Sequence, residues 1–450
     1  MDRILSKDDL LRVQNEHNVV LPYSDNTDIL LEPFKKGALD LPNRIVSMPM
    51  EGVDADPESG AVTDFSLRRY RRLAEGGSGL IWAEACAVVP EGKSNPKQFY
   101  ISNDNIGSYK RLVDETKAAA VAKNGKAPTM ILQLTHSGRF SRPYGVNAPV
   151  IAQRIPDLEK IQPLDDNAKI ISDDELDTLM EKFVQAALLA EKAGFDGVDM
   201  KSVHAYLIAE LFKARLRSGK YGGSYENRTR FYKDCVKYIK QALSKKTFVC
   251  TRLTVYEPSP FPYGWGVKEE EGSIEFDMTE PLKLISELKT MGIDLLGVSI
   301  GYPRTSPHWN RPYNMNVVGA PASPEHPILG VKRFIDVIEK IQKSNPDTIV
   351  VSAGTSWLGK CCVNVAAEML KSKMCTLAGF GRGLLAYPNI PNDLKQFGEI
   401  DGKKCCITCS KCSQIMKDLK SRSGCVMFDS KVYLPEYRQG REFAKSKGLA

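Results

Sequence analysis

Eight short apolar runs alternate with longer stretches of helical periodicity through most of this 450-residue chain. The runs are continuous rather than alternating, which suits parallel strands that helices cover on both faces. Eight such units predict an α/β chain that closes into a (β/α)₈, or TIM, barrel, with an open doubly wound sheet as the alternative. The expected strands are residues 44–50, 79–85, 129–135, 197–201, 247–253, 295–299, 348–352 and 375–378.

The helix expected before the fourth strand shows how the sequence marks its elements. Ser172 and Glu175 form the Ser-x-x-Glu pattern of a capping box, which satisfies free backbone N–H groups at a helix start. Gly194 stands where a helix commonly ends. Between them, apolar residues recur at helical spacing, at positions 176, 179, 180, 183, 187 and 190. The pattern predicts one amphipathic helix that leads directly into the next strand.

The chain divides into three parts by its patterns. We expect an N-terminal extension at 1–28, a barrel domain at 29–395, and a cysteine-containing segment with a basic tail at 396–450. Within the barrel, three loops are too long to be simple connections. All three follow expected strands, which places them at the end of the barrel where active sites lie. They are residues 137–170, 256–276 and 301–327.

The composition is that of an ordinary globular protein, with 42% hydrophobic and 26% charged residues. No apolar run approaches the roughly 18 residues that span a bilayer, and charges interrupt the start where a signal peptide needs an apolar stretch. We therefore expect a cytoplasmic protein without a membrane segment. The net charge of +7 is spread along the chain. Because no nucleic-acid motif is present either, we expect no nucleic-acid partner.

Five of the eleven cysteines crowd into residues 405–425. In a cytoplasmic chain they are not expected to form disulfides. Counted from Cys406, the spacing through Cys409, Cys412 and Cys425 is C-x₂-C-x₂-C-x₁₂-C. Thiolates at this spacing can hold one face of a [4Fe–4S] cluster, with the distant fourth closing the site. A structural zinc ion is the alternative, although its usual pattern is two separated C-x₂-C pairs. Cys405 could also replace Cys406 as the first ligand.

Polar and glycine-rich segments lie at the ends of the expected strands. They include Gln-Leu-x-His-x-Gly-Arg at 133–139, Tyr-Gly-Gly-Ser-x-Glu-Asn-Arg-x-Arg-Phe at 221–231, Cys-Thr-Arg-Leu at 250–253 and Gly-Phe-Gly-Arg at 379–382. Taken in order over residues 30–390, these segments resemble the old yellow enzyme, or NADH:flavin oxidoreductase, family. The block at 221–231 is the most specific of them.

The inner strand ends carry side chains suited to a flavin ring. Such a ring needs donors along its pyrimidine edge and a positive charge near N1 and O2, where negative charge gathers on reduction. Gln133 can supply the donor and Arg252 the charge, as the matching residues do in the family; a structural ion pair is the alternative for Arg252. The segment with Pro49 and Met50 resembles the family's backbone contact to the ring, or is simply a strand end that proline terminates.

The last two strand ends suit a phosphate group. A phosphate needs backbone N–H groups and a cation, and barrels commonly bind it after the seventh and eighth strands. Gly354 follows the seventh strand, and Gly381 and Arg382 follow the eighth. The resemblance assigns the phosphate of FMN to these residues. No separate dinucleotide fold is visible for an adenosine half, so we expect FMN rather than FAD.

The substrate side of the expected site centres on Lys201, His204 and Tyr206. In the family, a pair of histidines, or a histidine and an asparagine, holds the carbonyl oxygen of the substrate. A tyrosine then protonates the carbon next to the carbonyl after hydride has reached the β-carbon. His204 and Tyr206 match this pattern, whereas Lys201 replaces the first histidine and offers a point charge instead of a flat ring donor. Purely structural roles for His204 and Tyr206 are the alternatives.

The resemblance implies an FMN- and [4Fe–4S]-dependent ene-reductase, which reduces a C=C bond conjugated to a carbonyl. Its substrate would be an enoyl thioester, an enoate or an enone such as a steroid. The branch of the family with 2,4-dienoyl-CoA reductase and trimethylamine dehydrogenase carries a cluster just after the barrel, and the cysteine spacing here resembles the trimethylamine dehydrogenase form. Amine dehydrogenation is therefore one alternative, and an electron-transfer subunit of a larger complex is another.

The last expectation concerns the donor of the electrons that reduce the flavin. Larger members of this branch continue into a second flavin- and nicotinamide-binding region, whereas no Gly-x-Gly-x-x-Gly pattern follows the cysteine segment here. We expect a separate redox partner, such as a ferredoxin or a flavoprotein subunit, with NAD(P)H as the other donor. Lysines near the cysteines could steer an acidic partner, or form an ordinary solvated surface. They are residues 403, 404, 411, 417 and 420.

Overall fold

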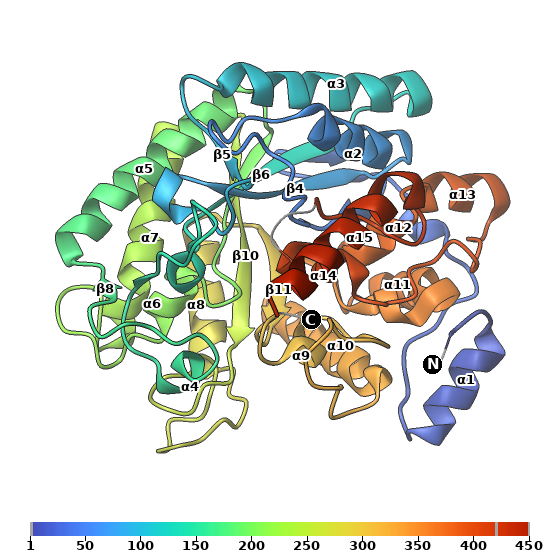
Figure 1. The fold of residues 1–450 in the computed structure, drawn as a ribbon. Helices are drawn as coiled ribbons and strands as arrows, with labels where there is room; N and C mark the ends of the chain where they lie inside the picture. Colours follow the sequence, from blue (N-terminus) through green and yellow to red (C-terminus); the bar gives the residue numbers. More distant parts are fainter. Residues whose placement is uncertain (1–2, 419–421, 449–450) are drawn as a thin grey trace.

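The computed structural model describes residues 3–418 and 422–448, and at its centre is a barrel of eight parallel strands (Figure 1). The strand order is β12-β11-β10-β9-β6-β4-β3-β13, and a parallel bridge between Val351 and Leu377 joins its two ends. The expected (β/α)₈ barrel is confirmed, and the open sheet is wrong. The barrel strands are β3 (Ile45–Ser47), β4 (Leu80–Ala87), β6 (Thr129–Thr135), β9 (Gly197–Met200), β10 (Phe248–Tyr256), β11 (Leu295–Ile300), β12 (Ile349–Val351) and β13 (Ala378–Phe380).

Two strand boundaries differ from the expected ones for identifiable reasons. The first strand is shorter than 44–50, since Pro49 has no N–H with which to continue the ladder. The eighth lies later than 375–378, because the amides of Thr376 and Leu377 both donate to the carbonyl of Val350 and form no regular ladder. In both cases the residues that follow the ordered strand are the ones expected to meet the flavin.

Long helices cover the outside of the barrel (Figure 1). The expected capping box is present in α5, where the Ser172 hydroxyl accepts from the Glu175 amide at 3.2 Å and the Glu175 carboxylate accepts from the Ser172 amide at 2.9 Å. The longer helices are α2 (Asp64–Glu75), α3 (Ile106–Asn124), α5 (Asp173–Lys192), α7 (Tyr225–Ala242), α8 (Thr279–Thr290), α10 (Pro327–Ser344) and α11 (Cys362–Lys371).

Shorter elements fill the connections, including the three long loops. They are η1 (Asp28–Leu30), β1 (Phe34–Lys36), β2 (Leu39–Leu41), η2 (Pro90–Gly92), β5 (Phe99–Tyr100), η3 (Gly138–Phe140), β7 (Val150–Ile151), α4 (Pro156–Glu159), β8 (Lys169–Ile170), α6 (Leu207–Phe212), α9 (Pro307–Asn310), η4 (Thr355–Cys361), α12 (Arg382–Ala386) and α13 (Ile390–Phe397). Within the described residues, no helix is long and apolar enough to cross a membrane.

Both ends of the chain pack against the barrel. Helix α1 (Lys7–Glu16) buries Leu10 and Val13, and the Lys360 amide donates to the Ile4 carbonyl at 3.0 Å. After the barrel come α14 (Lys411–Lys417) and α15 (Ser430–Ser446). Between these two helices the Ser423 amide donates to the Gly52 carbonyl at 2.7 Å, so the cysteine segment lies against the loop after β3. This contact brings the cysteines close to the carboxyl ends of the barrel strands.

Candidate active site

A buried aspartate ties together the strands that carry the expected flavin residues. Asp199 lies in β9, and its carboxylate accepts from Gln133 Nε2 of β6 at 2.6 Å and from the Arg252 amide of β10 at 2.8 Å. Trp82 Nε1 of β4 also donates to it at 2.8 Å. Burial raises the pKa of Asp199 to about 6. The aspartate therefore holds Gln133 and the backbone of Arg252 in fixed positions on the inner wall.

The guanidinium of Arg252 lies on this wall without an ionic partner. It forms no salt bridge within the described part of the chain, and its Nε is buried without a hydrogen bond. Burial lowers its pKa to about 10, although the charges of Asp199 and Glu51 act in the opposite direction. The alternative of a structural ion pair is thus not what the structure shows. A buried cation without a partner is costly, and the position fits the electron-rich edge of a flavin ring.

The ends of β3 and β13 lie side by side, as the parallel pairing of Ser47 with Phe380 requires. A side chain on Gly381 would approach the Met50 sulfur to 3.3 Å, so Met50 lies over this glycine. Pro49 is buried beside it. The two segments expected to contact the flavin ring and its phosphate are therefore neighbours in space.

The expected phosphate residues also come together. Gly354 directly precedes η4 and has φ +87°, a conformation that a residue with a side chain rarely adopts. The next hydroxyl, Thr355 Oγ1, is buried without a hydrogen-bond partner, as is Arg382 Nη1. Arg382 Nη2 donates to the Pro312 carbonyl at 2.7 Å. A glycine turn beside a partly unsatisfied arginine and an unsatisfied hydroxyl is the donor set that a phosphate needs.

On the substrate side, the structure brings Lys201, His204 and Tyr206 together and adds Glu51. The ammonium of Lys201 lies 2.9 Å from Glu51 Oε1 and 3.9 Å from the ring centre of Tyr206. The Tyr206 hydroxyl donates to the same Glu51 oxygen at 3.4 Å. The rings of His204 and Tyr206 are 6.4 Å apart and perpendicular. Lys201 is thus already engaged by Glu51 and the tyrosine, which sequence reasoning did not foresee.

The backbone that presents these side chains is strained. His204 and Ala205 have φ values of +69° and +53°, in the left-handed region that residues with side chains avoid. The Ala205 amide donates at 2.8 Å to Glu257, which is itself paired with Lys213 at 2.7 Å in the buried interior. Such strain persists only where the surroundings enforce it, and it concentrates at functional sites. Here it lies directly before Tyr206.

The surroundings of His204 and Tyr206 determine whether each ring carries its proton. Burial, together with the charges of Arg252 and Lys201, holds the pKa of His204 well below its usual value, so its imidazole is neutral near pH 7. Burial and the charge of Glu51 raise the pKa of Tyr206, so its hydroxyl keeps its proton. A neutral imidazole can donate a hydrogen bond to an oxygen, and a protonated phenol can give up a proton.

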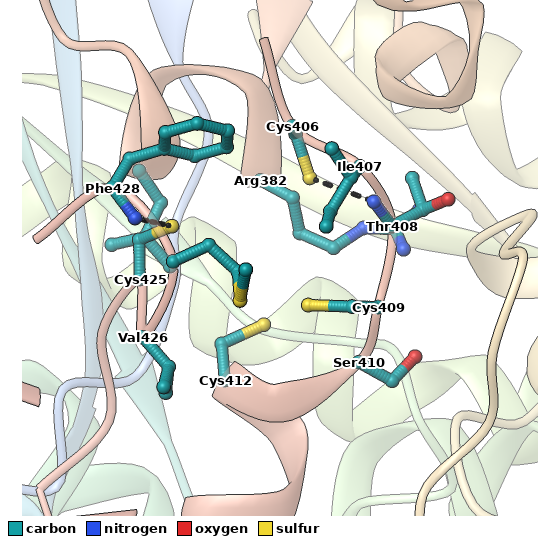
Figure 2. Close-up of a pocket in the computed structure, with 12 residues that line it drawn as sticks. Arg382, Cys406, Ile407, Thr408, Cys409, Ser410, Cys412, Cys425, Val426 and Phe428 are labelled. Carbon is teal, nitrogen blue, oxygen red and sulfur yellow. Dashed lines mark hydrogen bonds between the residues drawn. The ribbon is translucent and has the colours of Figure 1, made fainter. Parts of the chain in front are cut away.

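Four cysteines line one pocket after the barrel (Figure 2). Cys406, Cys409, Cys412 and Cys425 direct their sulfur atoms into a common space. The amides of Thr408 and Phe428 donate to the sulfurs of Cys406 and Cys425, each at 3.4 Å. Such N–H···S bonds stabilise thiolates and are common around iron–sulfur clusters. The four cysteines named from their spacing are those that meet in space.

The structure distinguishes the two adjacent cysteines. Cys405 is buried outside the pocket, and its thiol donates to the Asp401 carbonyl at 3.5 Å. Cys406 lines the pocket, together with Arg382 of the expected phosphate site. In the described residues, no three His, Cys, Asp or Glu side chains are arranged to hold a metal ion directly. The pocket offers four thiols around a space, and Arg382 belongs both to its lining and to the residues expected at the phosphate.

A barrel that gathers these side chains at the carboxyl ends of its strands is the scaffold of a flavin-dependent oxidoreductase. The comparison with known families agrees: residues 29–358 match the NADH:flavin oxidoreductase / NADH oxidase family. The chain belongs to this family. It is accordingly a flavin-dependent oxidoreductase with FMN as its cofactor.

Relatives of known sequence support this assignment. NADPH dehydrogenase of Halalkalibacterium halodurans is 31% identical over 275 residues, which are 60% of this chain and 73% of that protein. NADPH dehydrogenase of Clostridium acetobutylicum is 27% identical over 362 residues, 80% of this chain and 92% of that protein. The similarity thus spans most of both relatives.

Solved structures share the fold at low sequence identity. 2-Naphthoyl-CoA reductase has a TM-score of 0.68 at 18% identity, and histamine dehydrogenase from Rhizobium sp. 4-9 has 0.65 at 20%. They match 85% and 87% of this chain, which spans about half of their length, 54% and 51%. Morphinone reductase has a TM-score of 0.59 at 21% identity and matches 82% of this chain and 90% of its own.

Proposed function

We propose that this enzyme reduces a carbon–carbon double bond conjugated to a carbonyl group. The observation that carries the proposal is the pairing of a neutral His204 with a protonated Tyr206 at the same barrel mouth as Gln133 and Arg252. His204 can donate a hydrogen bond to the carbonyl oxygen of such a substrate, and Tyr206 can give a proton to the carbon next to the carbonyl. The substrate class is an enoyl thioester, an enoate or an enone.

When bound, FMN would supply the hydride for this reaction. His204 donates a hydrogen bond to the carbonyl oxygen, where negative charge develops. Tyr206 gives its proton to the carbon next to the carbonyl. Lys201 lies over the Tyr206 ring and is paired with Glu51, so we assign it to the positioning of the tyrosine. Arg252 and Gln133 hold the flavin edge.

The two directions of chemistry can be separated without knowledge of the natural substrate. Under anaerobic conditions, dithionite-reduced enzyme is mixed with 2-cyclohexenone, and oxidised enzyme is mixed with trimethylamine or histamine. We expect the enone to reoxidise the flavin and the amines to leave it oxidised. Flavin reduction by an amine, with no reoxidation by enones or enoyl thioesters, would assign the protein to amine dehydrogenation instead. Inactivity in both directions would favour an electron-transfer subunit.

A [4Fe–4S] cluster held by Cys406, Cys409, Cys412 and Cys425 is the second part of the proposal. The C-x₂-C-x₂-C spacing and the two N–H···S bonds in one pocket support it. When bound, the cluster supplies one-electron transfer. Iron and acid-labile sulfide are to be measured on anaerobically purified protein, with about four of each per chain expected. Zinc in place of iron, with no sulfide, would contradict the cluster.

The FMN phosphate gives a first prediction. Arg382→Ala removes a cation whose Nη1 has no protein partner, and a charge-assisted hydrogen bond to phosphate should be lost. We expect FMN to bind about 10- to 100-fold more weakly, measured by fluorescence titration of the apoprotein. Arg230→Ala, on the exposed side of α7, is the control for charge. Because Arg382 also lines the cysteine pocket, iron content is measured in parallel. Unchanged FMN affinity would place the phosphate elsewhere.

Glu51 gives a second prediction, which concerns pH. The charge of Glu51 raises the pKa of Tyr206, so Glu51→Gln should lower it. The reoxidation rate then declines at high pH as Tyr206 loses its proton, and this decline should begin at lower pH in the variant than in the parent enzyme. Rapid mixing of reduced enzyme with 2-cyclohexenone between pH 7 and 11 measures it. An unshifted alkaline limb would show that Glu51 does not act through the tyrosine.

We also propose a redox partner that docks beside the cysteine segment, with NAD(P)H as the alternative donor. Lys403, Lys404 and Lys417 are exposed there, and Lys411 is half-buried; Lys420 lies outside the described residues. Their charge suits an acidic surface.

All eleven cysteines are free, which fits a reducing compartment, and we place the enzyme in the cytoplasm.

A further inference from the structure

A second pocket opens beside the candidate active site, between two of the long loops. It encloses about 520 Å³ of space, part of it open to solvent. Phe140, Leu158 and Ile161 of the loop after β6 form its apolar wall, and Arg304 and Thr305 of the loop after β11 face them. Arg142, from the same loop as Phe140, also lines the pocket.

Neither arginine of this pocket has a direct ionic partner among the described residues, although the charge of Glu51 acts on Arg304 from a distance. Within the described part of the chain, Arg142 and Arg304 form no salt bridge. Arg142 Nε donates to Asn147 at 2.6 Å, and Arg304 lies 4.3 Å from the ring centre of Phe140 without a hydrogen bond to the described residues. Burial and the charge of Arg304 both lower the pKa of Arg142. Two cations that repel each other across a pocket are stabilised when an anion lies between them.

The pocket adjoins the proton donor. The ring of Phe140 lies 6.3 Å from that of Tyr206, and both belong to one apolar cluster with Leu158 and Tyr302. The charge of Arg304 also lowers the pKa of Tyr206, which places the guanidinium within electrostatic reach of the hydroxyl. A molecule whose double bond lies at Tyr206 can therefore extend past Phe140 into the pocket.

We propose that Arg142 and Arg304 form a subsite for an anionic group of the substrate, a carboxylate or a phosphate. This inference rests on the proposed reduction of a conjugated double bond and narrows its substrate class to anions. Phe140, Leu158 and Ile161 pack against the apolar part of the substrate between the reacting bond and the charge. Carboxylates and the phosphates of a coenzyme A thioester share this chemistry, and the test distinguishes them.

The test compares pairs of substrates that carry the same reacting double bond, with and without the anionic group. The first pair is 3-benzoylacrylate and its methyl ester, and the second is crotonyl-CoA and the crotonyl thioester of N-acetylcysteamine. Dithionite-reduced holoenzyme is mixed with each, and the second-order rate of flavin reoxidation is measured. We expect the charged member of at least one pair to react faster. A preference in the first pair identifies a carboxylate, and one in the second identifies the phosphates.

The variants are Arg304→Gln and Arg142→Gln, with Arg230→Gln on the exposed side of α7 as a charge-matched control. The preference for the charged member should fall by about 10- to 100-fold in each pocket variant, the range for one charge-assisted hydrogen bond. It should be unchanged in the control. No preference in the parent enzyme, or a preference that both pocket variants retain, overturns the subsite.

Binding without turnover separates this inference from the proposed function. Calorimetric titration of the oxidised holoenzyme with 3-benzoylpropionate and with coenzyme A measures the subsite alone. Suppose that Arg304→Gln weakens binding of either ligand while the parent enzyme reduces no enone or enoyl thioester. This result supports the subsite and refutes the ene-reductase. Reduction of enones without any preference for the charged substrate supports the ene-reductase and refutes the subsite. If Arg304→Gln weakens only the reduction of the flavin by NADPH relative to NADH, the pocket serves the reductant and the substrate assignment is wrong.

Discussion

Replacing Tyr206 by phenylalanine is expected to slow reoxidation of the reduced flavin by an enone about 10²- to 10⁴-fold, the contribution typical of general acid catalysis. Tyr206 is almost fully buried, and its hydroxyl keeps its proton because burial and the charge of Glu51 raise its pKa. Reduction of the flavin by NADPH needs no proton from this hydroxyl, so that half-reaction should change little. Rapid mixing resolves the two half-reactions.

The matched control is Tyr109→Phe, which removes another buried tyrosine hydroxyl, one that donates to the Gly60 carbonyl at 2.9 Å. It should leave both half-reactions near their original rates. Equal losses in the two half-reactions of Tyr206→Phe would mean that the tyrosine supports the flavin site in general. No loss at all would remove it from the proton-donor role, and solvent exchange into the product would then identify another donor.

Continuous apolar runs were sufficient to predict the barrel, because strands buried on both faces cannot alternate. Gln133 and Arg252 could be named as candidates for the flavin side because they are polar residues within such runs, and their contact with the flavin stays a prediction. Asp199 carried the same signal, a charge inside an apolar strand, and could have been found. In the structure it holds Gln133 at 2.6 Å.

The contacts that sequence reasoning missed join residues that are distant along the chain. Glu51 pairs with Lys201 across 150 positions, and no local pattern marks such a pair. Arg142 and Arg304 belong to different loops, whose approach depends on how each loop folds over the barrel mouth. The role expected for Lys201, a direct contact to the substrate oxygen, depended on its matching a family position; the structure adds the carboxylate that engages it.

The cysteine segment is different, because its pattern was local. Four thiols within twenty residues can close on one cluster with little chain between them, and Cys406, Cys409, Cys412 and Cys425 do line one pocket. The spacing of the cysteines could not show which other residues line their pocket. Arg382, expected only at the FMN phosphate, also lines this pocket.

The cysteine variant with the largest expected effect is Cys409→Ser, which should abolish the iron and sulfide content of the purified protein. Three thiolates and a serine hold a [4Fe–4S] cluster poorly, since the cluster is bound by four thiolates. The matched control is Cys405→Ser, because Cys405 lies next to the cluster cysteines in sequence but outside the pocket and donates only to the Asp401 carbonyl. It should retain full iron and sulfide, measured together with FMN content.

The same two variants test where electrons enter. If a ferredoxin or flavoprotein partner feeds the flavin through the cluster, Cys409→Ser should lose turnover driven by reduced ferredoxin but keep turnover driven by NADPH, provided that FMN remains bound. Cys405→Ser should support both. The exposed Lys403, Lys404 and Lys417 should make the ferredoxin-driven rate fall steeply with ionic strength, because steering between opposite charges is screened by salt. Full ferredoxin-driven turnover in a folded, cluster-free Cys409→Ser enzyme would show that electrons reach the flavin by another route, and that the cysteines serve structure alone.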